Sequence, residues 1–498
     1  MLNNLIAIKI KNRIKLIERA IQNPIECQNK ILINNIKYAK TTFFGDEHHF
    51  NIIENYSDFK DKVPLSDYLK LKGYIELSIK YKRDILWPGK IKWFAKSSGT
   101  TTHQSKFIPI TKESLKLCHF KAGKDMLSLY LQNNPNSKIL EGKSLMIGGS
   151  TNLNQFKYSY SGDLSAIIIK NLPIWVQIKR LPSMKTALLE DWEKKITNII
   201  QESQNQNITN ISGVPSWMAV IINQLMDKMN VTCLTDIWPN LELYMHGGIS
   251  FQNYRKSFEH YINKKNINYM ELYNASEGFF GIQNQKGKSD LLLLIDHGIF
   301  YEFIPIENGE EKEDEIISLE NVQINKIYSM VITTNGGLWR YRIGDTIKFT
   351  SLIPYKIKIS GRTQSFINSF GEELNEDVAN LAIEYASNQT NSIVNEYTAG
   401  PLFFSDKTGS HEWMIEFQQK PKNLKKFIYL LDEKLKSLNS DYEAKRNNNI
   451  LLKSPIIRIV DNNFFYLFLK RKNKIGGQNK IQRLHNNRFF LEELIKTL

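Results

Sequence analysis

The sequence has few cysteines and no long apolar run. Its three cysteines, Cys27, Cys118 and Cys233, lie far apart, and so sparse and odd a set argues against a disulfide framework or a zinc site. Residues 1–19 alternate apolar and basic residues at helical spacing and lack the continuous apolar run of a signal peptide. No apolar stretch is long enough to cross a bilayer. We therefore expect a cytoplasmic protein with no membrane partner.

Two nucleotide-binding signatures are also missing. Gly142-Lys143-Ser144 looks like the end of a Walker loop, but Ser137 stands where that motif needs its first glycine. No Gly-x-Gly-x-x-Gly fingerprint follows an expected strand. These two phosphate-binding folds are therefore disfavoured.

The charge of the chain is basic but diffuse. Lysines and arginines number 66 against 51 aspartates and glutamates, a formal net charge of +15. The excess runs along the whole length together with many Asn and Ile, a bias that an AT-rich genome produces without selection for any partner. The chain shows no basic helix and no basic-aromatic stripe of the kind that single-strand binders use. We therefore expect no nucleic-acid partner.

What the chain does have is enough apolar sequence for large cores. With 498 residues, 42% hydrophobic and 11% aromatic, it should form at least two domains. Residues 5–22 and 24–39 carry apolar side chains every three to four positions, which predicts helices. Short apolar segments bounded by polar or glycine turns predict buried strands of a mixed sheet. These segments are 145–150, 240–244, 269–273, 291–295 and 328–334, and the acidic stretch 307–315 is expected at a hairpin tip.

A change of domain is expected just after residues 360–362. The elements expected beyond it are helices over 373–387 and 424–438 and strands over 392–397, 411–418 and 455–460, with 464–469 completing a small unit. We therefore expect an α/β fold with a large N-terminal domain over 1–360, in which mixed β-sheets are flanked by helices. A linking segment over 361–370 and a small α+β domain over 371–498 would follow.

The most informative segment is a hydroxyl-rich run between Lys96 and Pro109. Apolar residues precede and follow it, so two strands joined by a flexible turn are expected. Gly99 lets the backbone curl so that consecutive N–H groups face one anion, and Lys106 adds a mobile positive charge. The hydroxyls of Ser97, Ser98, Thr100 and Thr101 add neutral donors. The segment suits a polyphosphate, and a solvated Ser/Thr loop is the alternative.

Two acidic residues follow other expected strands. Glu277 ends the segment Tyr273-Asn-Ala-Ser276-Glu277, and a carboxylate at a strand end suits Mg²⁺ bound against phosphate oxygens. Asp345 follows a tight turn at Gly344, where a carboxylate suits ribose hydroxyls. An exposed turn glutamate and an ordinary hairpin Gly-Asp are the structural alternatives.

Two basic residues are the last candidate site residues. Arg362 is a candidate phosphate contact beside the expected domain boundary. Lys480 ends a second glycine-tipped loop, Gly476-Gly477-Gln-Asn-Lys480, for which a solvent-exposed turn lysine is the alternative.

Together these segments resemble the adenylate-forming superfamily of acyl-CoA synthetases, luciferases and peptide-synthetase adenylation domains, which has them in this order. They are more similar to the auxin-responsive Gretchen Hagen family of acyl-acid amido synthetases and its bacterial branch. The segments that carry this likeness are Ser97-Ser-Gly-Thr-Thr101 with Lys106-x-Ile-Pro109, Tyr273-x-x-Ser-Glu277-Gly-x-Phe-Gly281 and Tyr341-Arg-x-Gly-Asp345. The resemblance runs from residue 90 to the Lys480 loop, and the helical N-terminus is also typical.

The resemblance implies a role for each matching residue. Glu277 would hold Mg²⁺, Arg362 would mark the hinge, and Lys480 would reach the substrate carboxylate and the α-phosphate. This chain has Lys480-Ile-Gln482-Arg483 where the family usually has Lys-x-Pro-Arg, which makes that loop less rigid. The implied ATP-binding residues are Ser97, Ser98, Gly99, Thr100, Thr101, Lys106, Gly247, Gly248, Tyr273, Ser276 and Asp345.

The activity that the resemblance implies has two stages, with ATP and Mg²⁺ as cofactors. A small carboxylic acid is first adenylated, with release of pyrophosphate, and an amino acid or other amine then takes the acyl group. Transfer to a thiol, either coenzyme A or a carrier protein, is the alternative, and a basic nucleic-acid-binding or scaffold protein that retains the fold is a third. The acyl pocket is not identified, because Trp217, Tyr244 and His246 fit core packing as well as a substrate pocket.

Overall fold

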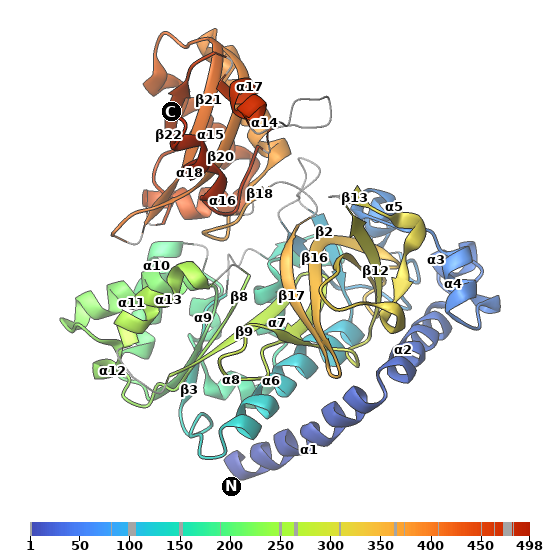
Figure 1. Ribbon diagram of the computed structural model, residues 1–498. Helices are drawn as coiled ribbons and strands as arrows, with labels where there is room; N and C mark the ends of the chain where they lie inside the picture. Colours follow the sequence, from blue (N-terminus) through green and yellow to red (C-terminus); the bar gives the residue numbers. More distant parts are fainter. Residues whose placement is uncertain are drawn as a thin grey trace. The chain divides into compact units, whose positions relative to one another are not determined.

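The chain forms two compact units, which the computed structural model describes in most of their length. The described residues up to Thr363 form the first unit and those from Gln364 form the second (Figure 1). The description covers residues 2–498 apart from 81, 98–105, 149–152, 190, 249–250, 263–266, 308–309, 363–365, 373, 407, 450, 463, 472–480 and 482. Only the backbone is described for residues 2–11, 97, 192, 216–217, 252–254, 256–257, 310, 360–362, 366, 375–377, 418, 448, 466 and 469–470.

The N-terminal part of the first unit is helical, as expected. Helix α1 (Leu2–Gln22) lies beside α6 (Phe120–Asn133), and α2 (Pro24–Ala39) begins with a proline, whose missing N–H costs nothing in a first helical turn. The side-chain amide of Gln28 on α2 donates to the carbonyl oxygens of Ile295 (2.7 Å) and Ile299 (2.9 Å), which ties the helix to the sheet. The next helices are α3 (Phe43–Glu47), η1 (Phe50–Ile52), α4 (Tyr56–Lys62) and α5 (Tyr68–Ile79).

The described part of the first unit is built around a mixed sheet of 13 strands. Its order is β13-β12-β15-β16-β17-β11-β10-β9-β8-β7-β3-β6, with β14 beside β12. Neighbours from β13 to β9 are antiparallel and those from β9 to β6 are parallel. The strands are β3 (Lys143–Met146), β6 (Arg180–Leu181), β7 (Ile208–Ser212), β8 (Leu243–Gly247), β9 (Asn268–Ala275), β10 (Gly278–Ile282), β11 (Leu291–Leu293), β12 (Ile299–Glu307), β13 (Glu310–Glu311), β14 (Ile317–Ser318), β15 (Ile327–Thr334), β16 (Tyr341–Leu352) and β17 (Tyr355–Arg362). The expected strands near 145, 240, 270, 291 and 328 are confirmed, with ends shifted by a few residues.

A second, smaller sheet carries the hydroxyl-rich segment. Its order is β2-β1-β5-β4, from β1 (Trp93–Ser97), β2 (Lys106–Ile110), β4 (Asn154–Gln155) and β5 (Tyr160–Gly162). β1 and β2 pair antiparallel with Ser97 opposite Lys106, which confirms the two flanking strands. The turn between them, residues 98–105, lies outside the described residues.

Helices connect the parallel strands, because a parallel pair needs a crossover. Helices α10 to α13 gather on the side of the unit where β3, β8 and β9 lie, drawn in green in Figure 1. Among the described helices, none is both long and apolar enough to span a bilayer. The remaining helices of this unit are η2 (Ser114–His119, a π-helix that continues into α6), α7 (Leu164–Asn171), α8 (Ile174–Lys179), α9 (Met184–Ala187), α10 (Trp192–Ser203), α11 (Pro215–Met229), α12 (Leu234–Ile237), α13 (Gln252–Ile262), η3 (Glu313–Glu315) and η4 (Leu319–Asn321).

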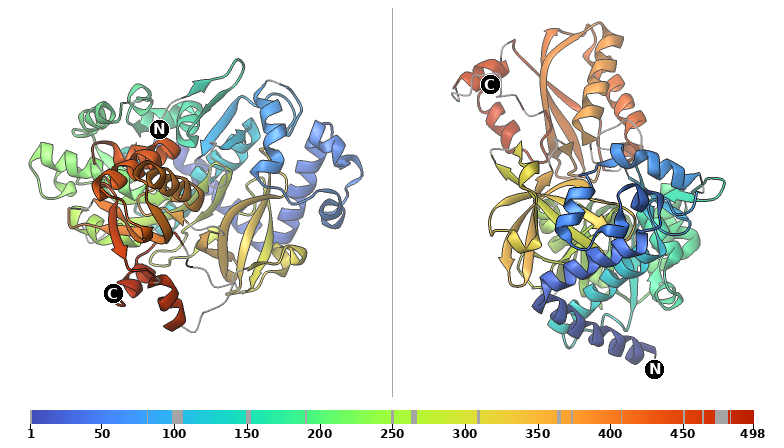
Figure 2. Two further views of the ribbon diagram at one scale, coloured as in Figure 1. Left: turned by 90° about the horizontal axis from the view of Figure 1, so that it is seen from above. Right: turned by 90° about the vertical axis from the view of Figure 1, so that its right-hand side faces the viewer.

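The second unit is a three-stranded sheet, β20-β21-β22, with helices on both faces (Figure 2). Alternate residues of β21 point to opposite faces, so Trp413 joins the core under α14 and α15 while Met414 packs against Leu491 and Leu494 of α18. Segment 464–469 is helical. The elements are β18 (Phe366–Ile367), β19 (Leu374–Asn375), α14 (Glu376–Thr390), β20 (Ile393–Phe403), β21 (Gly409–Gln419), α15 (Leu424–Leu438), α16 (Ser440–Arg446), η5 (Asn447–Asn449), β22 (Ile456–Val460), α17 (Phe464–Arg471) and α18 (Phe489–Ile495).

Candidate functional site

The centre of the candidate site is a hydrogen bond between two motifs that are far apart in the sequence. The hydroxyl of Tyr273 on β9 donates to Oδ2 of Asp345 on β16 at 2.7 Å, and both side chains are buried. The sequence predicted that Asp345 follows a strand, but in the structure Asp345 lies within β16. The register between β15 and β16 shifts between Arg342 and Thr346, and Gly344 in this bulge has a φ of +85°. A bulge turns a side chain away from regular strand geometry, and here it accompanies the contact of Asp345 with Tyr273.

Glu277 lies in the turn that joins β9 to β10, at the carboxyl end of the last parallel strand. Gly278 follows as the first residue of β10, and a Cβ there would come within 2.6 Å of the end of the Ile299 side chain, which would have to shift. The pKa of Tyr341 is raised, first by burial and then by the negative charge of Glu277. The charge of Glu277 therefore acts on the tyrosine that opens the Tyr341-Arg-x-Gly-Asp345 segment. Ser276 lies in the same turn.

The base of the hydroxyl-rich turn reaches the same region through Tyr68. The Tyr68 hydroxyl accepts a hydrogen bond from the backbone N–H of Phe107 at 3.0 Å, and the ammonium group of Lys106 lies 6.0 Å from the centre of the Tyr68 ring. Ser66, two residues before Tyr68, forms a parallel bridge with Tyr341. The β1–β2 pair, the Glu277 turn and the start of β16 are thereby linked within the first unit. Ser98, Gly99, Thr100 and Thr101 lie outside the described residues, and of Ser97 only the backbone is described.

Gly247 and Gly248 end β8, next to β9. A Cβ on Gly247 would collide with the carbonyl oxygen of Leu272, and Gly248 has a φ of +83°, which favours glycine. The pair therefore lets two parallel strands end close together, at the edge where open α/β sheets bind ligands.

Two aromatic residues of β8 belong to the core. Tyr244 is fully buried and stacks on Phe258 with ring centres 4.7 Å apart. The ring of His246 stacks on Phe251 at 4.1 Å, and its burial lowers the pKa of His246 to about 3. Both side chains therefore pack among aromatic residues of the core. The Trp217 side chain lies outside the described part of the chain.

The two expected basic residues are less completely described. The backbone of Arg362 pairs with Asp345 in the β16–β17 ladder, but its side chain is not among those described. Lys480 lies outside the described residues.

Sequence reasoning missed the segment that adjoins the site from the N-terminal side. Ser66 forms a parallel bridge with Tyr341, and Asp67 adds to the negative potential at the Tyr341 hydroxyl. The Ser66-Asp67-Tyr68 segment carries no glycine, charge cluster or repeat that marks it in the sequence. Only the fold brings it to β16.

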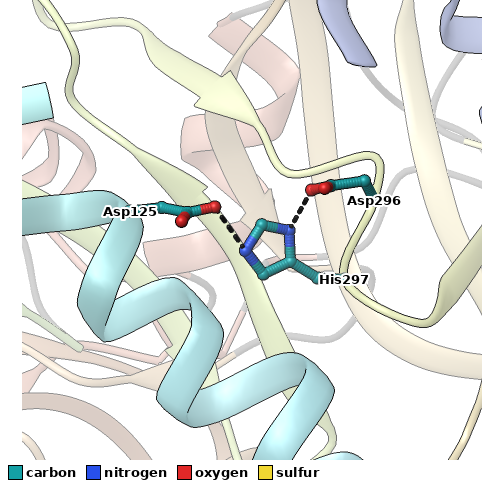
Figure 3. A group of neighbouring side chains, drawn as sticks. All are labelled: Asp125, Asp296 and His297. Carbon is teal, nitrogen blue, oxygen red and sulfur yellow. Dashed lines mark ion pairs between the residues drawn. The ribbon is translucent and has the colours of Figure 1, made fainter. Parts of the chain in front are cut away.

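A second cluster of titratable side chains lies elsewhere in the first unit. The ring of His297 lies between two carboxylates, with Nε2 3.1 Å from Oδ2 of Asp125 and Nδ1 2.9 Å from Oδ1 of Asp296 (Figure 3). Ligand atoms of these three residues lie within 4.8 Å of one another, which is the spacing of a metal site. The two carboxylates, however, already hold cations.

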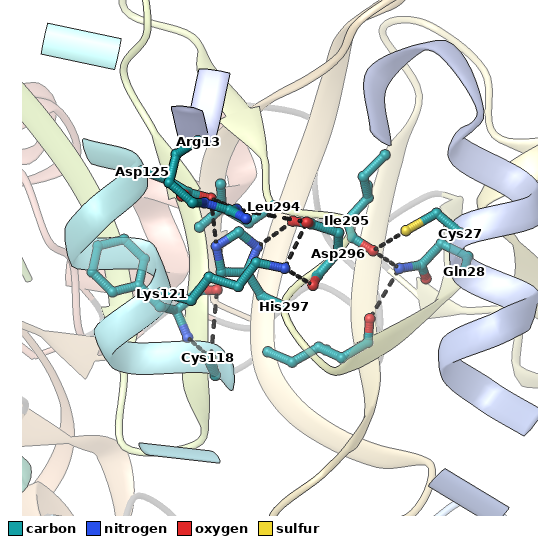
Figure 4. A network of polar contacts seen from close by, with 12 residues as sticks. Arg13, Cys27, Gln28, Cys118, Lys121, Asp125, Leu294, Ile295, Asp296 and His297 are labelled. Atoms are coloured by element: carbon teal, nitrogen blue, oxygen red, sulfur yellow. Dashed lines mark hydrogen bonds and ion pairs between the residues drawn. The ribbon is translucent and has the colours of Figure 1, made fainter. Parts of the chain in front are cut away.

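Arg13 and Lys121 supply those cations (Figure 4). Arg13 binds both oxygens of Asp125, at 2.6 and 2.7 Å, and Lys121 lies 2.6 Å from Oδ2 of Asp296. Burial alone would raise the pKa of Asp296, but His297 and Lys121 outweigh it and hold that pKa well below its usual range. A divalent cation would have to displace these groups, so the arrangement is a charge network that joins α1, α6 and the β11–β12 turn.

The chain matches one protein family over nearly its whole length. Residues 13–267 match the GH3 family N-terminal domain, residues 292–362 the GH3 family central domain and residues 377–489 the GH3 family C-terminal domain. A curated relative is the indole-3-acetic acid-amido synthetase GH3.4 of Arabidopsis thaliana, 22% identical over 91% of this chain and 87% of the relative. Another is the indole-3-acetic acid-amido synthetase GH3.2 of the same plant, 22% identical over 78% of this chain and 83% of the relative.

Solved structures show the same fold. The GH3.15 acyl acid amido synthetase matches with a TM-score of 0.62 at 17% identity, covering 98% of this chain and 95% of that one. A 2-hydroxyisobutyryl-CoA ligase in complex with 2-HIB-AMP and CoA matches with a TM-score of 0.59 at 12% identity, covering 95% and 93%. The expected fold class, that of the adenylate-forming enzymes, is thereby confirmed. Since the first family match alone spans just over half of the residues, the chain belongs to the GH3 family, the Gretchen Hagen family that its motifs resemble.

Proposed function

We propose that this chain is an ATP-dependent acyl-acid amido synthetase, which adenylates a carboxylic acid and transfers the acyl group to an amino acid or other amine. The observation that carries the proposal is the buried contact between Tyr273 and Asp345, around which Glu277, Tyr341 and the base of the hydroxyl-rich turn also gather. The names of the curated relatives support the same activity.

We assign the nucleotide contacts by position in the motifs. The hydroxyl-rich turn and Lys106 would hold the phosphates, Tyr273 would flank the adenine, and Asp345 would accept hydrogen bonds from the ribose hydroxyls. One oxygen of Asp345 already accepts from Tyr273, which orients the carboxylate. Gly247, Gly248 and Ser276 would border the adenosine, where the absence of large side chains leaves room for the ligand.

Glu277 is the residue that we propose to hold Mg²⁺. A carboxylate at a strand end fits a cation that takes one or two carboxylates and completes its shell with phosphate oxygens and water. Mg²⁺ bound there would neutralise negative charge on the triphosphate. The chain's own contribution is to keep the carboxylate in the tight turn between β9 and β10.

The reaction has two stages in this proposal. A carboxylate oxygen of the acid attacks the α-phosphorus of ATP, and the bond to pyrophosphate breaks. The amine nitrogen then attacks the acyl carbonyl carbon, AMP leaves, and the amine loses a proton. Lys480 and Arg362 would neutralise charge in the first stage, and a swing of the second unit about residues 361–370 would exchange the groups presented to the site.

The test is exchange of labelled pyrophosphate into ATP, measured across a panel of carboxylic acids. We expect exchange only when a suitable acid is present, and we expect Lys480→Ala to lower it by about 10²–10³-fold, as loss of one preorganised charge contact does. Lys496→Ala, at the end of α18, is the matched control. Exchange that Lys480→Ala leaves unchanged would remove this lysine from the mechanism, and no exchange with any acid would contradict the adenylation itself.

Transfer to a thiol is the second candidate function, because the CoA ligase cited above shares the fold. Adding amino acids or coenzyme A to the preformed adenylate and identifying the product by mass distinguishes the two acceptors. A basic nucleic-acid-binding protein would instead show no ATP turnover and salt-sensitive binding. A bacterial origin and a cytoplasmic location stay predictions of the sequence.

A further inference from the structure

Arg340, directly before the Tyr341-Arg-x-Gly-Asp345 segment, has an unusual backbone conformation. Its φ is +43°, in the left-handed region, and only 3% of its surface is exposed. A bulky residue rarely adopts this conformation, which persists only where surrounding contacts hold it and which is concentrated at functional sites. The contacts of Arg340 therefore decide the conformation of the chain as it enters β16.

The guanidinium group is held on two sides. Its Nε lies 3.1 Å from both oxygens of Glu302 on β12, and its Nη2 lies 2.9 Å from one of them. Its Nη1 donates to the carbonyl oxygens of Lys60 (3.0 Å) and Val63 (2.7 Å) at the end of α4. Glu302 is fully buried and also accepts from the hydroxyl of Tyr56 at 3.1 Å. One side chain thus joins the N-terminal helical region to the sheet.

Hydrogen bonds also fix the backbone of Arg340 and of the residues on either side of it. Its N–H donates to Oγ1 of Thr333 at 3.0 Å, and its carbonyl oxygen accepts from the N–H of Ser66 at 2.9 Å. The Ser66 hydroxyl donates to the carbonyl oxygen of Trp339 (2.6 Å), and the Ser66 carbonyl oxygen accepts from the N–H of Arg342 (2.9 Å). Ser66 therefore contacts the residues before and after Arg340 as well as Arg340 itself.

Stabilisation of the fold alone does not explain these contacts of Arg340. A buried ion pair adds little net stability, because desolvation of both charges offsets their attraction, and the left-handed backbone adds a further cost. What the contacts achieve is a defined position for Tyr341, which opens β16, and for Asp345, which accepts from Tyr273.

We propose that Arg340, braced by Glu302 and Ser66, is a positioning residue for the nucleotide site and sets where Tyr341 and Asp345 lie. The inference rests on the proposed function, since it concerns the same site. It also makes the N-terminal segment around Ser66 part of the structure that holds that site.

The test compares two arginines that each bind a carboxylate with two nitrogens, in the full-length protein. Arg340→Lys keeps the charge but loses the planar fork, and Arg13→Lys makes the same change in the pair with Asp125. The readouts are the melting temperature, the dissociation constant for ATP by equilibrium titration, and acid-dependent pyrophosphate exchange. We expect both variants to melt earlier but only Arg340→Lys to bind ATP more weakly, with kcat/KM for ATP lower by about 10²-fold, the cost of a misplacement of roughly 1 Å.

A milder variant covers the case in which Arg340→Lys does not fold. Ser66→Ala removes only the hydroxyl that holds Trp339, and we expect it to weaken ATP binding in the same direction by a smaller factor. ATP affinity equal to wild type in the folded Arg340 and Ser66 variants would overturn this inference alone. Wild-type protein that binds no ATP would instead overturn the proposed function and the inference with it.

Discussion

Two arginine–carboxylate pairs, one partly buried and one buried, fasten the N-terminal helical region to the rest of the first unit, and they differ in what lies next to them. Arg13 on α1 binds Asp125 on α6, and the network continues to Asp296 and His297 in the β11–β12 turn. Arg340 binds Glu302 on β12 and the carbonyl oxygens at the end of α4. The chemistry is the same in both, but only the second pair adjoins the strand that carries Asp345.

The comparison shows that the chemistry of a buried charge network does not reveal its role. The Asp125–His297–Asp296 cluster has the residue types and spacing of a metal site, yet Arg13 and Lys121 already satisfy its carboxylates. The Arg340–Glu302 pair matches no site pattern, yet it holds strained backbone at the entrance to β16. The role of such a network is indicated more by the backbone and side chains around it than by its titratable groups.

The largest effect that we expect from breaking the first network is on stability. Asp125→Ala leaves the Arg13 guanidinium and the His297 ring without their shared carboxylate, so unfolding should become easier by about 3–5 kcal/mol, the usual cost of breaking a buried pair from one side. Urea titration measures this loss. The KM for ATP of the folded fraction should not change, and a large rise in that KM would erase the distinction between the two networks.

The acid sensitivity of the first network is a second way to test it. The folded-state pKa of Asp296 is depressed, so its stabilising contribution is present above its unfolded-state pKa of about 3.9 and is lost as the pH falls through the folded-state value. Asp296→Asn should therefore be less stable than wild type at pH 7, and the gap should narrow on acidification below about pH 5. Urea titrations at several pH values measure the gap. Asp61→Asn, at an exposed position, is the control, and a gap that stays constant with pH would contradict the assignment.

The smallest effect that we expect is on the KM for ATP, from a substitution in the site itself. Tyr273→Phe removes one hydroxyl and with it the hydrogen bond to Asp345, a loss of about 0.5–1.5 kcal/mol. If that bond orients the carboxylate for ribose, the KM for ATP should rise by roughly 2–10-fold, since 1.4 kcal/mol corresponds to a factor of ten. Tyr74→Phe removes a comparable bond to Glu47, 2.8 Å long and exposed, and should leave that KM unchanged. Equal effects of the two substitutions would argue against an orienting role for Tyr273.

Much of the fold near the site could be predicted from local patterns. The strands on either side of the hydroxyl-rich turn, the strand before Glu277 and the helices over 5–22 and 24–39 follow from apolar periodicity, because burial of one face imposes a period on the chain. The placement of Asp345 was wrong. A Gly-Asp pair has the pattern of a turn, but Arg342 and Thr346 on either side of it pair with Val331 and Ser329 of β15, across a bulged ladder that keeps Asp345 inside β16.

The family, the order of the motifs and several strands and helices near the site follow from residue types at short spacing. Tertiary structure was needed to show that Tyr273 contacts Asp345, that Ser66 and Arg340 brace β16, and that Arg13 and Lys121 fill the Asp125 cluster. Such contacts join residues tens to hundreds of positions apart. No local preference encodes them, since they arise only when sheet register and helix packing bring those segments together.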